Sequence, residues 1–123
     1  MERTVNSVNY DYFGRQKIIN NLCRNFPFIK KTTLGVSCGG RDITALKIGS
    51  ASRYSLITAA FHGSEHITST VLLMFIEELA NALNDDGYIA GFRATKALSG
   101  RGVIFVPCVN PDGCEISLLG AKG

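Results

Sequence analysis

The stretch YSLITAAFHGSEH, Tyr54–His66, decides the fold because it joins a strand pattern directly to a polar motif and a helix. Its first part, Tyr54–Phe61, is almost continuously apolar, which predicts an interior strand covered on both faces. The following run, Ile67–Leu83, is rich in Leu, Met, Glu and Ala and predicts a helix that is apolar nearly all round and deeply packed. Between them, His62 and Glu65 form a His-x-x-Glu pair at the end of the predicted strand.

Four other segments carry secondary-structure signals. Residues Tyr12–Phe26 place apolar side chains close to helical spacing and stop at a proline. The β-rich runs Thr32–Ser37 and Ile43–Ile48 flank a turn with two glycines, which predicts a hairpin. Val103–Val109 predicts a second interior strand, and Pro107 within it indicates an edge, a bulge or the exit of that strand.

The order of these elements predicts an α/β fold with a mixed sheet, parallel central strands and flanking helices. The strands at 54 and 103 form the parallel part, and Tyr88–Gly102 is expected to be a surface excursion with a helical turn around Ala94–Leu98. In such sheets ligands bind beyond the carboxyl ends of parallel strands. His62 and Asn110 occupy those two ends, so we expect them to converge in space.

Composition excludes several classes of protein. The chain has 123 residues, 46% hydrophobic and 19% charged, which suits one globular domain. Its net charge of +3 comes from scattered basic residues, so we expect no nucleic-acid partner. No apolar run has the length of a membrane span, and the first residues do not resemble a signal peptide, so we expect a cytoplasmic location.

The four cysteines are Cys23, Cys38, Cys108 and Cys114, and none is in a C-x-x-C pair. Free and mostly buried thiols are the preferred interpretation, although an even number leaves two disulfides open. Cys108 and Cys114 could also bind a metal as thiolates, but a role in the core or a strand agrees better with the general burial of cysteine.

His62 and Glu65 are the candidate metal ligands. An imidazole nitrogen and a carboxylate oxygen three residues apart in a turn can face one point, and zinc suits that pair. A bound zinc would acidify a water and polarise a carbonyl, which points to hydrolysis. The alternative is a histidine at a strand end beside a carboxylate that caps the next helix.

Three landmarks together resemble the zinc carboxypeptidase (funnelin) family. They are the Gly40–Ile43 turn followed by Leu46–Gly49, the pair His62 and Glu65, and the segment Val109–Gly113, which contains Asn-Pro-Asp-Gly. They occur in the order of that family, and the resemblance extends from about Tyr10 to Gly113. It implies that His62 and Glu65 bind zinc in a metallopeptidase that hydrolyses peptide or γ-glutamyl amide bonds.

Gly63 and Ser64 between the ligands make the motif similar to bacterial γ-D-glutamyl-diaminopimelate peptidases, which implies a peptide substrate, in the narrower case one derived from peptidoglycan. The third zinc ligand, the catalytic glutamate and the arginine and tyrosine that bind substrate lie further downstream in that family. We therefore expect residues 1–123 to be the amino-terminal portion of a single catalytic domain, with no catalytic residue of its own and no hydrolytic activity in isolation. Uncovered strands should also promote self-association.

Two other functions stay open at this point. His62, Glu65 and His66 fit the H-x-x-E-H pattern of inverted zincins, but Gly63 and the strand ending at Phe61 disfavour a helix there. We expect His66 instead in the first turn of the following helix, exposed or hydrogen-bonded. The second alternative is a non-catalytic peptide-binding or structural domain that retains half of the fold.

Three further polar residues have two interpretations each. Arg41 could contact a substrate, but a turn residue paired with a neighbouring carboxylate such as Asp42 is preferred. Asn110 and Asp112 could orient the metal ligands without binding the metal themselves, yet Asn-Pro-Asp-Gly also suits a plain turn. The turn is our preferred interpretation, with Asn110 facing the cleft as the secondary one.

Overall fold

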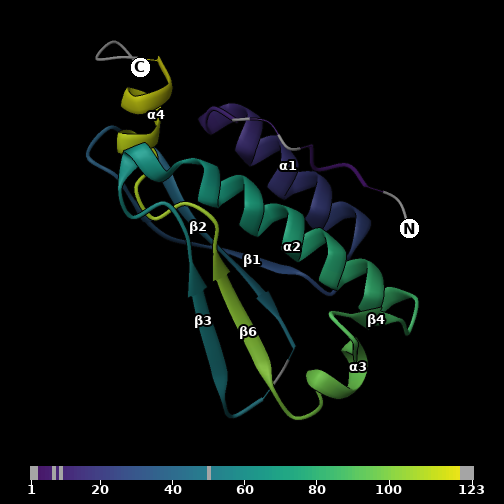
Figure 1. The fold of residues 1–123 in the computed structure, drawn as a ribbon. Coiled ribbons are helices and arrows are strands. Elements are labelled where there is room, and N and C mark those ends of the chain that lie inside the picture. Colours follow the sequence, from purple (N-terminus) through teal and green to yellow (C-terminus); the bar gives the residue numbers. More distant parts are fainter. Residues whose placement is uncertain (1–2, 7, 9, 50, 120–123) are drawn as a thin grey trace.

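The computed structural model describes residues 3–6, 8, 10–49 and 51–119. These residues form two long helices, a four-stranded sheet and several short elements (Figure 1). In chain order the elements are α1 (Tyr12–Asn25), β1 (Lys30–Val36), β2 (Asp42–Ile48), β3 (Tyr54–Thr58), the 3₁₀ helix η1 (Gly63–Glu65), α2 (Ile67–Asn84), β4 (Tyr88–Ile89), β5 (Phe92–Arg93), α3 (Ala94–Ala97), β6 (Gly102–Val106) and α4 (Pro111–Leu119).

The sheet has the strand order β1-β2-β6-β3. β1 and β2 form the expected antiparallel hairpin, β2 pairs antiparallel with β6, and β6 pairs parallel with β3. The parallel pair is connected through α2, since two parallel strands cannot be joined by a tight turn. The predicted fold class, a mixed sheet with helices in an α/β fold, is thus confirmed.

The two long helices lie on the same side of the sheet (Figure 1). They contribute to one core together with β2 and β6, because each presents an apolar stripe to the sheet. The largest fully buried side chains of this core are Ile19 and Leu22 from α1, Leu73 and Ile76 from α2, Leu46 and Ile48 from β2, and Phe105 from β6.

The expectation of an interior strand over Tyr54–Phe61 is wrong. β3 is outermost among the described strands, ends at Thr58, and exposes 66% of Leu56. The helix α2 is also not buried all round, because Ile67, Val71 and Phe75 expose 40–58% of their surfaces. These three residues lie at positions i, i+4 and i+8, so they form a single stripe. An apolar strand sequence does not reveal whether a neighbour covers it.

Two buried carboxylates attach the amino-terminal part of the chain to later helices. Glu77 of α2 is 3% exposed and accepts hydrogen bonds from the backbone N–H groups of Thr4, at 2.9 Å, and Val5, at 3.1 Å. Glu115 of α4 is 5% exposed and accepts one from the N–H of Tyr12, the first residue of α1. Neither anchor was expected from the sequence, because each joins residues more than 70 positions apart.

The segment after α2 contains more structure than the sequence indicates. The helical turn predicted around Ala94–Leu98 is confirmed as α3, but the short antiparallel pair β4 and β5 before it was not expected. Arg93 at the end of β5 donates to Asp86 at 2.6 Å, which closes this hairpin onto the end of α2. Among the described residues, no helix is both long and apolar enough to cross a membrane.

We expect the apolar stripe on α2, together with the edge of β3, to drive self-association of this chain. Val71→Lys should reduce association, because it places a charge in the groove lined by Ile57, Ile67, Val71 and Phe75. Phe13→Lys on α1 is the matched control, since Phe13 is a single exposed apolar residue at 79%. Sedimentation velocity at several concentrations measures the effect, and a strictly monomeric wild-type chain would contradict the expectation.

Candidate metal centre

Backbone pairing continues beyond the ends of β3 and β6 and brings two loops together. The N–H of Ala59 donates to the carbonyl of Val106 at 3.1 Å, and the N–H groups of Val109 and Asn110 donate to the carbonyls of Ala59 and Ala60, both at 3.0 Å. The loop that carries His62 therefore lies beside the Asn110 segment. The convergence predicted from the parallel strands is confirmed.

A small hydrogen-bonded loop then presents the His-x-x-Glu pair. Ala60 adopts a positive φ of 56°, a conformation that non-glycine residues rarely take, and so turns the chain away from the strand direction. Its N–H donates to Oγ1 of Thr68 at 2.9 Å, and that hydroxyl donates to the carbonyl of Glu65 at 2.7 Å. The first turn of α2 thus closes the loop that contains His62.

The two predicted ligands lie together and face solvent. Nδ1 of His62 and Oε1 of Glu65 are 3.5 Å apart, and the side chains are 78% and 55% exposed. Two donors of a tetrahedral zinc, each about 2.1 Å from the ion, lie about 3.4 Å apart. The observed separation and the nitrogen and oxygen donors therefore fit two positions of a zinc site.

The described residues supply no further ligand. Within 3–6, 8, 10–49 and 51–119, no group of three or more His, Cys, Asp or Glu side chains is arranged to hold a metal ion. A zinc bound by His62 and Glu65 would need at least one more protein ligand to reach the usual coordination.

His66 does not complete the pair. It precedes α2, where its carbonyl accepts from the N–H of Ser69, close to the first-turn position expected for it. The side chain is half-buried, and its Nδ1 atom is buried with no partner among the described residues, so the expectation of an exposed or hydrogen-bonded side chain is not met at that atom. His62 has extended backbone angles (φ −104°, ψ 136°), so the two histidines do not sit one turn apart on an α-helix. An inverted zincin requires that helix, and the geometry here disagrees with it.

The Asn-Pro-Asp-Gly segment begins a helix, so its interpretation as a plain turn is wrong. Asn110 accepts from the N–H of Gly113 at 2.9 Å through its side chain, and Pro111 is the first residue of α4. An asparagine cap followed by proline is a favourable helix start. The amide of Asn110 also donates to the carbonyl of Phe61 at 3.2 Å, so it supports the backbone directly before His62.

Arg41 pairs with Asp112 and not with Asp42. Its Nη1 donates to the Asp112 carboxylate at 3.0 Å, which also accepts from the Ser37 hydroxyl at 2.7 Å and the Gly39 N–H at 2.8 Å. These donors, the Ser37 hydroxyl above all, hold the pKa of the Asp112 carboxyl below its usual value of 3.8. The turn between β1 and β2 is thereby fastened to the first turn of α4. Sequence reasoning missed this clamp, although the Gly-Arg and Asn-Pro-Asp-Gly landmarks contain both partners.

Gly63 is required by a close approach of two backbones. A Cβ atom at this position would lie 2.2 Å from the carbonyl oxygen of Gly113 in α4. The glycine inside the His-x-x-Glu pair therefore allows η1 to pack against α4.

We expect Asp112→Asn to lower Tm by about 4–8 °C at neutral pH, equivalent to about 1 kcal/mol in a small domain. Because the folded-state pKa is lowered, the stabilisation is present above about pH 4 and is lost as the pH falls through the folded pKa. Thermal unfolding of the variant and the wild type should therefore converge in acid. Asp42→Asn is the matched control, and an equal effect at Asp42 would contradict the clamp.

We expect Gly63→Ala to be strongly destabilising, because the neighbouring atoms are backbone and cannot move aside. Gly35→Ala serves as the control, since no atom lies within 4 Å of the added Cβ there. Urea unfolding of both variants gives the comparison. Equal midpoints would show that η1 and α4 are not packed as described.

Comparison with known proteins places these motifs in a family. Residues 16–122 match the zinc carboxypeptidase family. The chain is 34% identical over 115 residues to the uncharacterized protein YqgT of Bacillus subtilis, covering 92% of this chain and 31% of that protein. It is 30% identical over 112 residues to gamma-D-glutamyl-L-diamino acid endopeptidase 1 of Lysinibacillus sphaericus, covering 91% of this chain and 28% of that protein. The chain thus spans about a third of the length of these relatives.

The fold is also similar to that of solved carboxypeptidase-like structures. Bovine thrombin-activatable fibrinolysis inhibitor, solved in complex with tick carboxypeptidase inhibitor, superimposes with a TM-score of 0.76 at 17% identity. The match covers 92% of this chain and 35% of that one. At this identity the structural likeness concerns the fold alone, whereas the family match covers most of the sequence, and on that basis the chain belongs to the zinc carboxypeptidase family.

Proposed function

We propose that His62 and Glu65 are two of the protein ligands of a catalytic zinc in a metallopeptidase. The observation that carries this proposal is the 3.5 Å separation of Nδ1 of His62 and Oε1 of Glu65 on an exposed loop. Both residues lie inside the segment that matches the zinc carboxypeptidase family. Zinc bound there would supply a Lewis acid and an acidified water for hydrolysis.

Neighbouring residues hold the loop that carries His62 and Glu65 in place. The parallel backbone pairing brings Phe61 beside α4, and the amide of Asn110 holds the Phe61 carbonyl. The Asp112 clamp fixes the start of α4 to the turn that contains Arg41. In this proposal Asn110 and Asp112 are positioning residues, because they touch the backbone and Arg41 but not the two donors. A rigid support of this kind keeps the ligands close to their bound geometry.

The proposed substrate is a peptide with a γ-glutamyl amide bond, of the type found in cell-wall peptides. This class is supported by the name of the Lysinibacillus sphaericus relative, a gamma-D-glutamyl-L-diamino acid endopeptidase, at 30% identity. We also propose that the 123-residue chain alone does not hydrolyse such a peptide, because its described part offers two ligands and no additional carboxylate beside them to act as base.

We expect the chain to bind one zinc ion weakly, in competition with a chromogenic chelator. His62→Ala and Glu65→Ala should each reduce the affinity at least tenfold, because each removes one of two donors. Ser64→Ala is the matched control between the ligands and should leave the affinity unchanged, as should His66→Ala. Circular dichroism of each variant checks that the fold is retained.

Three outcomes would contradict the proposal. If His62→Ala leaves the zinc affinity unchanged, His62 is not a zinc ligand. If His66→Ala abolishes zinc binding, the set of ligands is different from the one proposed. Hydrolysis of a γ-D-glutamyl-L-diamino acid peptide by the wild-type chain that persists in His62→Ala would show that catalysis occurs elsewhere.

A further inference from the structure

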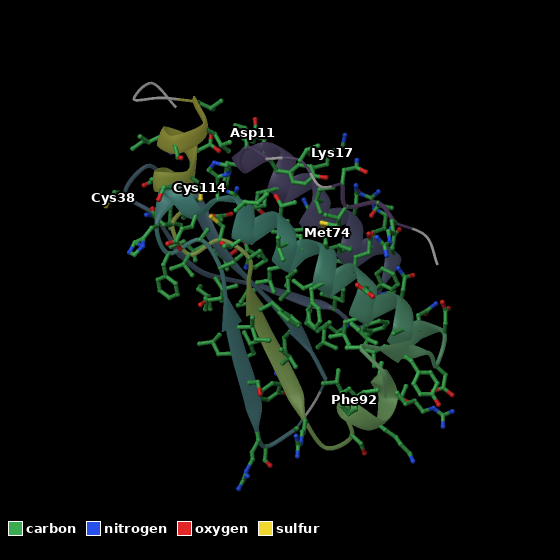
Figure 2. The ribbon with its side chains drawn as sticks, in the orientation of Figure 1. Asp11, Lys17, Cys38, Met74, Phe92 and Cys114 are labelled. Carbon is green, nitrogen blue, oxygen red and sulfur yellow. The ribbon has the colours of Figure 1, made fainter. Side chains whose placement is uncertain are left out.

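The thiols of Cys108 and Cys114, which flank the Asn-Pro-Asp-Gly segment in the sequence, lie close together. All four cysteines are free thiols, and of these Cys108 and Cys114 are buried. Their sulfur atoms are 3.5 Å apart, and with Ala60 they form a small cluster separate from the main core. Cys114 lies in the first turn of α4, whereas Cys38 lies at the periphery of the molecule (Figure 2). The sulfurs need to approach by about 1.5 Å to form a disulfide, a movement that side-chain rotation can supply.

A buried cation lies near this pair. Arg15 is 3% exposed, and its Nη2 atom has no hydrogen-bond partner among the described residues. Its positive charge favours the ionised form of both thiols. The hydrogen bond between the two sulfurs is the largest influence on both thiols: it lowers the pKa of Cys114 to about 7 and, together with burial, raises the pKa of Cys108. The other terminal nitrogen of this guanidinium, Nη1, donates to the carbonyl of Tyr10 at 3.4 Å. A thiol pair beside a buried guanidinium and at a helix start has the electrostatic surroundings of reactive cysteines.

We propose that Cys108 and Cys114 are a redox pair that forms an intramolecular disulfide on reaction with a peroxide. The Cys114 thiolate attacks one peroxide oxygen, the O–O bond breaks, and the released hydroxide takes a proton to leave as water. The Cys108 thiol then attacks the resulting sulfenic acid, the S–S bond forms, and the S–O bond breaks with loss of a second water. Two thiols are oxidised to one disulfide, and one peroxide is reduced to two waters.

The disulfide would close a loop around the residues that support the candidate metal centre. Asn110 and Asp112 lie between the two cysteines, and they hold the Phe61 carbonyl and Arg41 respectively. Oxidation would tie the exit of β6 to the first turn of α4 and restrict this segment. Both sulfurs are buried, so the oxidant must be as small as hydrogen peroxide or must enter when α4 opens locally.

The test treats the folded, reduced chain with hydrogen peroxide and then alkylates the remaining thiols. Cleavage after Lys and Arg places Cys108 and Cys114 in one peptide, residues 102–122, and places Cys23 and Cys38 in two others. We expect this peptide to lose the mass of two hydrogens and to carry no alkyl group, with reversal by dithiothreitol. The variant Cys23→Ser/Cys38→Ser should give the same result, because it retains only the proposed pair.

A second variant separates the two chemical steps. In Cys108→Ser, Cys114 should be trapped as sulfenic acid by dimedone, because no thiol remains to displace the oxygen. Peroxide treatment that modifies Cys38 but leaves Cys108 and Cys114 alkylatable in the wild type would overturn the proposal. A disulfide that forms only in denaturant, or that joins either cysteine to Cys38, would overturn it as well.

Discussion

The parallel backbone pairing of β3 with β6 is the constraint on which the rest of the molecule depends. Backbone carbonyl and N–H groups that are buried need partners, and the pairing extends past the strand ends through Ala59 and Ala60 to Val109 and Asn110. Two loops that are almost fifty residues apart in sequence consequently leave the sheet at one place. The 3₁₀ helix, the start of α2 and the start of α4 all take their positions from this point.

The elements that the sequence predicts well are those with local signals. The hairpin around the two glycines, the helices at 12–25 and 67–84, and the turn of helix at Ala94 each follow from spacing and turn chemistry within a few residues. The convergence of His62 and Asn110 was also predictable, because parallel strands end at the same edge of a sheet. These features are therefore set by short stretches of chain and by one topological rule.

The features that sequence reasoning got wrong depend on distant partners. The apolar sequence of β3 suggests cover on both faces, yet its exposure depends on which strand lies next to it, and a periodicity carries no such information. Arg41 has a carboxylate directly beside it at Asp42, but its partner is Asp112, 71 residues away. Asn-Pro-Asp-Gly suits a turn and also a helix start, and the packing of Gly113 against Gly63 favours the second. Tertiary contacts determine the burial of a strand, the partner of a charged side chain and the choice between turn and helix. These contacts cannot be inferred from the local pattern of a single sequence.

The anchoring of Thr4 and Val5 by Glu77 has a consequence for how the chain opens. A buried carboxylate that loses its N–H donors is left without compensation, so Thr4 and Val5 are not free to detach on their own. The amide hydrogens of Thr4 and Val5 would then exchange with solvent only when the middle of α2 becomes accessible. The backbone amides of Thr4 and Val5 would therefore report on the opening of the central helix.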